Sequence, residues 1–137
     1  MHDAPSSKVT FDYAMIRVVP SVERGEFLNV GVIVFCSERH FLEAKIELDC
    51  ARVKAFAPNI DQETIEEYLQ KIPLICVGGK AAGTIGQMTQ RERFHWLIAP
   101  RSTIIQTSPG HCGLCDDPAV VLERLLEKLV RVGECGN

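Results

Sequence analysis

Two charged segments, far apart in the sequence, carry the residue types with which a protein could bind an anion or transfer a proton. The first holds Glu23, Arg24, Glu26 and Asn29 between two apolar runs. The second, residues 91–103, mixes basic and aromatic side chains, and its polar candidates are Arg91, Arg93, His95, Arg101 and Ser102. Carboxylates can act as general acids or bases, and arginine and tryptophan dominate binding hot spots. These polar residues are therefore our candidate site.

Two interpretations of these segments remain open. In the first, Arg24 pairs with a neighbouring carboxylate and Asn29 caps or hydrogen-bonds the turn. Arg91 and Arg101 are then paired to Glu23, Glu26 or Glu92 as well, and the loop is a structural clasp. In the second, these carboxylates and Asn29 line a polar pocket in which the arginines hold an anionic ligand and one carboxylate acts as a base. The sequence shows no nucleophile–base pair with a diagnostic spacing. We therefore favour a structural role over catalysis, and lean toward a protein that is not an enzyme.

A C-x-x-C motif near the C-terminus gives the weaker metal candidates, which are Cys112, Cys115 and the adjacent His111. A structural zinc site needs four ligands and usually draws them from two such pairs. Only Cys135 supplies a further thiol downstream, and two aspartates at 116–117 oppose formation of a reactive thiolate. We therefore expect no metal and no cofactor, and we interpret these cysteines as incidental residues of a loop.

The composition is that of an ordinary globular protein, with 137 residues, 46% hydrophobic and 24% charged. We expect a flexible N-terminal tail over residues 1–10 and a single domain over residues 11–137. The net charge of -3 makes nucleic-acid binding unlikely, and no apolar run reaches the roughly 20 residues of a membrane span. The polar N-terminus lacks the apolar core of a secretory signal. Together with cysteines in apolar contexts, this predicts a cytoplasmic protein.

Hydrophobic periodicity predicts the elements that must position the two charged segments. The apolar run Val30–Cys36 is typical of a strand covered on both faces, in the middle of a sheet. Further strands are predicted at 13–18, 42–48, 94–99 and 103–107, helices at 49–57, 61–72 and 118–130, and a loop at 108–117. The expected fold is α+β, with a largely antiparallel sheet of about five strands and two to three helices packed on one face.

Two blocks of this sequence resemble a known bacterial family, family 3037 of the domains of unknown function. The first block is YAMIRVVPSVERGEFLNVGVIVFC, and its typical residues are Arg17, Pro20, Arg24, Glu26, Asn29, Val30 and Gly31. The second is RERFHWLIAPRSTIIQTSPGHCGLCDDP, where a Phe–Trp segment leads into Pro100, Arg101, Ser102 and Thr103. This chain has Gly110 and Cys112 where the family pattern has Val and Thr, which further weakens a metal or redox role for the C-x-x-C motif.

The resemblance implies a stand-alone protein that is often encoded beside a HipA-like kinase. Our leading hypothesis is therefore a non-enzymatic cytoplasmic accessory protein that binds another protein, with the HipA-like kinase as a candidate partner. The alternative is a small enzyme or ligand-binding protein for a phosphorylated or nucleotide-like anion. Pairing of an exposed edge strand with a second copy would also allow a homodimer, and neither a membrane nor a nucleic acid is an expected partner.

Overall fold

The fold is built on one antiparallel sheet, and the computed structural model describes residues 8–101 and 103–131. The strands are β1 (Val9–Val18), β2 (Leu28–Cys36), β3 (Phe41–Ile46), β4 (Ile105–Thr107) and β5 (His111–Cys115). Their order is β3-β2-β1-β4, and β5 pairs with the other half of β1. This confirms the α+β class, the antiparallel sheet and the central position of residues 30–36. In the described part of the chain, no helix is long and apolar enough to cross a membrane.

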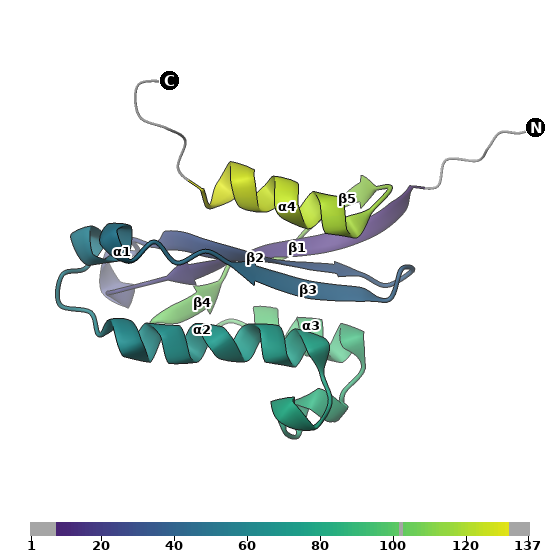
Figure 1. Ribbon diagram of the computed structural model, residues 1–137, viewed down its shortest axis with the longest axis horizontal. Helices are drawn as coiled ribbons and strands as arrows, with labels where there is room; N and C mark the ends of the chain where they lie inside the picture. The colour runs from purple at the N-terminus through teal and green to yellow at the C-terminus, as the bar shows by residue number, and fades with distance from the viewer. Residues whose placement is uncertain (1–7, 102, 132–137) are drawn as a thin grey trace, which may run out of the picture.

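Helices cover both faces of the sheet, so the prediction that they pack on one face is wrong. Figure 1 shows α4 (Pro118–Leu129) on one side of the sheet and α2 (Gln62–Val77) and α3 (Gln90–Ile98) on the other. The cause lies in β2, whose alternate side chains are buried in two separate cores. Ile33 packs with the α2 and α3 side, whereas Val32 packs with the α4 side. A strand that is apolar on both faces requires a cover on each.

The segment 94–99, predicted to be a strand, is part of helix α3. Its aromatic residues have high β propensity, but a capping box begins a helix a turn earlier. The Thr89 hydroxyl accepts a hydrogen bond from the Glu92 amide, and the Glu92 carboxylate accepts one from the Thr89 amide. The helix then buries Phe94 and Leu97 against the sheet. The predicted two to three helices are therefore too few, because α3 adds one to those expected. The short helix α1 (Cys50–Phe56) precedes α2 as expected.

Helix α2 continues past Pro73 to Val77, although we predicted that the proline would end it. A proline inside a helix removes one backbone hydrogen bond and costs roughly 3 kcal/mol. Here the next turn buries Ile75 and Cys76 with the same core as Ile72. Burial of these apolar side chains offsets the lost hydrogen bond, so tertiary packing overrides the local preference.

The expected loop at 108–117 contains a strand, because residues 111–115 pair with residues 9–13 of β1. Val9 and Phe11 point into the core under α4. The tail that we predicted to extend to residue 10 therefore ends earlier, since β1 begins at Val9. Residues 1–7 lie outside the described part of the chain.

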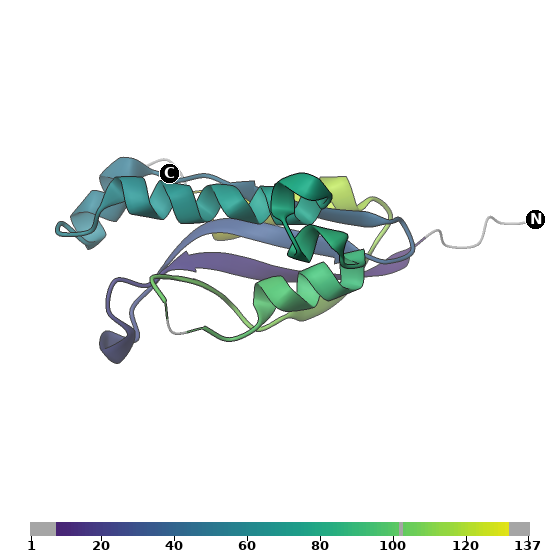
Figure 2. The same ribbon diagram turned by 90° about the horizontal axis from the view of Figure 1, so that it is seen from below.

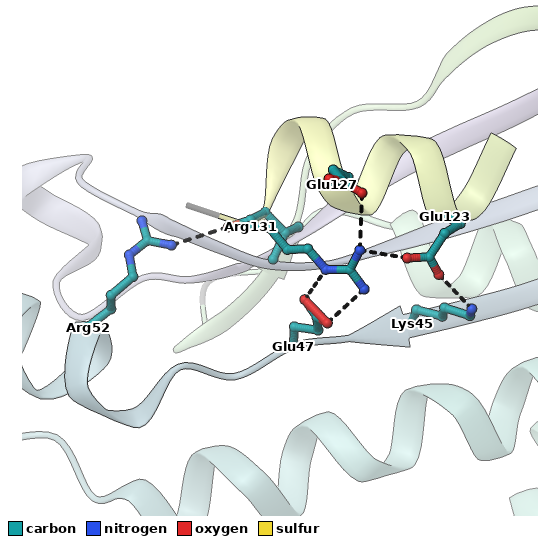
Figure 3. A network of polar contacts seen from close by, with 7 residues as sticks. Lys45, Glu47, Arg52, Glu123, Glu127 and Arg131 are labelled. Atoms are coloured by element: carbon teal, nitrogen blue, oxygen red, sulfur yellow. Dashed lines mark hydrogen bonds and ion pairs between the residues drawn. The ribbon is translucent and has the colours of Figure 1, made fainter. Parts of the chain in front are cut away.

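The C-terminal end of α4 is held against the edge of the sheet by a network of charged side chains (Figure 3). Arg131 donates two hydrogen bonds to the Glu47 carboxylate, at 2.6 and 2.8 Å, and forms an ion pair with Glu123 at 2.6 Å. Lys45 binds the same Glu123 at 2.9 Å. Arg52 donates to the Val130 carbonyl oxygen, at 3.2 Å. The network joins α4 to β3 and α1, so it is a structural clamp.

Acidification is expected to weaken this clamp. The hydrogen bond from Arg131 lowers the pKa of Glu47, and those from Lys45 and Arg131 lower the pKa of Glu123. A lowered carboxyl pKa stabilises the folded state above the ordinary value of about 4.5, and this stabilisation is lost as the pH falls through the folded-state pKa. We expect Arg131→Gln to lower the urea midpoint at pH 7, with a difference from wild type that shrinks below pH 4.5. Coincident pH profiles of the variant and wild type would show that the clamp contributes nothing, and a constant offset would show that its contribution does not come from these ionised carboxylates.

Candidate functional site

The first charged segment lies in the connection between β1 and β2, and its one ion pair among the described residues joins two residues of the same loop. Glu23 lies in a short 3-10 turn (Val22–Arg24) and is exposed. Arg24 Nε donates to Glu26 Oε1 at 2.8 Å, and both side chains are more than half exposed. This hydrogen bond lowers the pKa of Glu26. The pair is therefore a local contact of the loop, where solvent screens its charges.

Asn29, the last candidate of this segment, faces helix α4. Its side-chain amide Nδ2 donates to the Leu129 carbonyl oxygen at 3.3 Å. Leu129 is the last residue of α4, where carbonyl groups lack helical partners. Asn29 therefore satisfies a helix end and has a structural role.

Arg93 is a buried cap for the C-terminal end of α2. Its Nη1 donates to the carbonyl oxygens of Ile75 and Cys76, at 2.9 and 2.6 Å, and its Nε donates to Met88 at 3.1 Å. Gly78 follows with a φ of 80°, and a Cβ at this position would lie 2.8 Å from Arg93 Cζ. Arg93 as a whole residue is 8% exposed. It is therefore committed to the fold and is not free to hold a ligand.

The other candidates on α3 lie apart from one another. The Arg91 guanidinium carbon is 5.3 Å from the centre of the Phe35 ring, beside a shallow hollow that His40 also lines. His95 is exposed, and its ring lies 6.1 Å from that of Phe94. Among the described residues, Arg91 and His95 therefore share no common site. Ser102 lies outside the described residues.

Arg101 folds back over the C-terminal end of α3. Its Nη2 donates to the Trp96 carbonyl oxygen at 2.6 Å, and its Nη1 donates to those of Leu97 and Ala99 at 3.1 and 3.2 Å. Its guanidinium carbon also lies 4.2 Å from the centre of the Trp96 ring. Three carbonyl groups and one aromatic face therefore hold this cation in place.

The described residues of the two charged segments form no polar contact with one another. Among the described residues, no hydrogen bond or ion pair joins Glu23 or Glu26 to Arg91, Arg93 or Arg101. The clasp between the segments and the shared polar pocket are therefore both absent from this part of the chain. Of the arginines in the second segment, Arg101 is the one that lines a well-formed concave site.

That site is a groove of about 360 Å³ between α2, α3 and the segment leading into β4, which we call the α2–α3 groove. Figure 2 shows the two helices side by side on this face of the sheet. The groove is largely apolar, with Ile72 and Ile75 from α2, Leu97 from α3, and Ile104 and Ile105. Tyr68 and Trp96 stand at its sides and are 44% and 38% exposed.

Both charged residues that line the groove are cations. Lys71 lies on α2, with its ammonium 5.6 Å from the centre of the Tyr68 ring, and Arg101 lies beyond the end of α3. Within residues 8–101 and 103–131, neither cation has a carboxylate partner, and no acidic side chain lines the groove. An apolar floor with uncompensated positive charge is thus exposed on a chain whose net charge is -3.

The α2 wall of this groove was not predicted from the sequence. Neither Tyr68 nor Lys71 was among the candidate residues predicted from the sequence. The sequence pattern that could have indicated this wall is the spacing of four residues, which places all of them on one side of a helix: Tyr68, Lys71, Ile72 and Ile75. The pattern was missed because the helix was predicted to end before Pro73, which left Ile75 outside it.

The C-x-x-C motif lies in strand β5, and its two thiols point to opposite faces. Side chains alternate along a strand, so residues three apart cannot converge on one ion. Cys115 is buried in the core under α4, whereas Cys112 is exposed. In the described part of the chain, no three His, Cys, Asp or Glu side chains gather closely enough to hold a metal ion. Cys135 lies outside the described residues.

Burial predicts which cysteines react. Cys50 and Cys112 are exposed, whereas Cys36, Cys76 and Cys115 are buried. Burial also raises the pKa of Cys76 to about 12, which disfavours its reactive thiolate. A short iodoacetamide pulse on the folded protein, followed by peptide mass spectrometry, is expected to modify Cys50 and Cys112 first and Cys76 last. Equal labelling of Cys112 and Cys115 would contradict the strand assignment of the motif.

Fold and groove together define a small α+β protein with a largely apolar groove flanked by cations. The chain belongs to the family described as Protein of unknown function (DUF3037), whose family model matches residues 13–130. This match confirms the family resemblance seen in the sequence. No curated protein and no solved structure matches the chain.

Proposed function

We propose that this protein is a non-enzymatic cytoplasmic accessory protein, and that it binds an apolar segment of another protein in the α2–α3 groove. The groove supports this proposal because its exposed rim combines Tyr68, Trp96 and Arg101, the residue types that dominate binding hot spots. Its floor is apolar, as in the desolvated centre of an interface. By family resemblance, a HipA-like kinase is the first partner to test.

The single tryptophan of the chain makes this proposal testable. Trp96 lines the groove, so its fluorescence reports occupancy of this surface. We would add the purified candidate kinase, and peptides selected from a random library, to the full chain and record Trp96 emission. Saturable change in emission supports the proposal. Binding by the kinase or peptides that leaves Trp96 emission unchanged would place their contact outside the groove and contradict it.

A second candidate function is binding of a nucleotide-like anion. It is favoured by the two aromatic rings, on which a base could stack, and by Lys71 and Arg101, which could contact phosphate. A catalytic version has no support, because Glu23 and Glu26 lie outside the groove. Saturable quenching of Trp96 by mononucleotides or phosphate esters would favour this function, and no response from the panel would exclude the members tested.

A further inference from the structure

We infer that the segment bound in the α2–α3 groove carries an apolar side chain with carboxylates on both sides of it. This inference rests on the proposed function, because it specifies the chemistry of the same partner. The groove has one cation on each wall, Lys71 from α2 and Arg101 beyond α3, and an apolar floor between them. A complementary segment therefore places apolar atoms over the floor and negative charge toward each wall.

Arg101 is suited to a carboxylate because it is fixed in place and retains free donors. Its bonds to three carbonyl oxygens involve Nη1 twice and Nη2 once. A guanidinium has five N–H donors, so Nε–H and one Nη2–H have no partner among the described residues. Two donors are what a carboxylate accepts in a bidentate contact. Little side-chain entropy is lost on binding, since the guanidinium is already held.

Lys71 supplies the second charge and is paired with no carboxylate in the described part of the chain. Its ammonium contacts the face of the Tyr68 ring. The exposed Glu66 and Glu67 lie nearby on the same helix but do not line the groove. They would repel an acidic segment displaced along α2, so charge favours one position of the segment.

An acidic peptide segment fits this surface better than a nucleic acid does. The floor between the cations is formed by aliphatic side chains of Ile72, Ile75 and Leu97, which suit an apolar side chain. A nucleic acid would instead bring a continuous line of phosphates toward an acidic protein. Of the described residues, only two cations line the groove to neutralise these phosphates, and the net charge of the chain, -3, would repel them.

A selection from a library of random dodecapeptides on the full-length chain tests this inference. We expect the enriched peptides that change Trp96 emission to carry an aromatic or aliphatic residue with Asp or Glu on both sides. Enrichment of neutral or basic peptides that change Trp96 emission would overturn the inference and leave the proposed function standing. If neither a peptide nor the kinase changes Trp96 emission, both fail, and a saturable response to mononucleotides instead would indicate the second candidate function.

Charge reversal on the groove wall provides the matched test. We expect Lys71→Glu to weaken binding of a selected acidic peptide roughly tenfold at low salt. Lys128→Glu makes the same charge change on α4, across the sheet, and is expected to leave affinity within about twofold. A peptide with lysine in place of the matching carboxylate is expected to recover affinity for Lys71→Glu. Equal effects of the two reversals, or no recovery, would overturn the inference.

Discussion

Replacement of Arg93 by alanine is expected to lower the free energy of unfolding by roughly 3 kcal/mol. The buried guanidinium satisfies the carbonyl oxygens of Ile75, Cys76 and Met88, and Arg93→Ala leaves all three without this donor. It also removes the side chain that fills the space beside Gly78. Urea denaturation followed by far-ultraviolet circular dichroism measures the change.

Arg91 is the matched control for this prediction, because it lies on the same helix and carries the same charge. Arg91 is exposed and its guanidinium lies over the Phe35 ring, and it donates to no carbonyl group among the described residues. We expect Arg91→Ala to cost less than about 1 kcal/mol. Gly78→Ala tests the same contact from the other side, because the added Cβ would clash with the Arg93 guanidinium. The backbone of residue 78 also has a positive φ, which strains any residue other than glycine. Equal stability losses at Arg91 and Arg93 would refute the capping role of Arg93.

The second large effect is on binding. We expect Trp96→Ala to weaken a groove-bound peptide by about 2 kcal/mol, or roughly thirtyfold, because a rim tryptophan is a typical hot spot. The substitution also removes the ring against which Arg101 stacks, at 4.2 Å. Fluorescence anisotropy of a labelled peptide measures the affinity, since the variant lacks the intrinsic reporter.

His95→Ala is the control for this substitution. His95 is the preceding residue on α3, is exposed, and does not line the groove. We expect its affinity for the peptide to match that of wild type, and both variants to unfold within about 1 kcal/mol of wild type. A loss of affinity shared by Trp96→Ala and His95→Ala, or shown by neither, would argue against the groove as the binding surface.

The sheet was predictable wherever local patterns agreed with tertiary packing. The unbroken apolar run of residues 30–36 indicates a central strand, and residues 42–48 alternate as an edge strand does. The helix starts at Asp49, Asp61 and Asp117 were also predictable, because each aspartate side chain accepts a hydrogen bond from the first helical turn.

Helix α3 and the end of α2 were missed where local and tertiary preferences conflict. The aromatic residues around Trp96 favour a strand by propensity, and the capping box at Thr89 and Glu92 was the opposing signal. Pro73 favours a helix end, but burial of Ile75 extends the helix. Both errors affected the same region, so the sequence prediction placed a strand and a helix end where the groove is formed.

The candidate site was predictable only in part, because the groove depends on contacts between distant segments. Arg101 was singled out from its charge and its aromatic neighbours, and it does line the groove. Lys71 becomes its counterpart only when α2 and α3 lie side by side. Conversely, Arg93 and Arg101 have similar neighbours in the sequence, so the sequence could not show that they have different roles. Arg93 is buried and caps α2.

The most direct test of groove binding is a two-dimensional ¹H–¹⁵N correlation spectrum of the full chain, recorded with and without a selected peptide. We predict that the largest shift changes fall on amides of residues 68–75, 96–101 and 104–107, which form the groove. Amides of α4, on the opposite face of the sheet, are expected to change little. The largest changes on α4 or around the Arg24–Glu26 pair would contradict groove binding and place the interaction surface elsewhere.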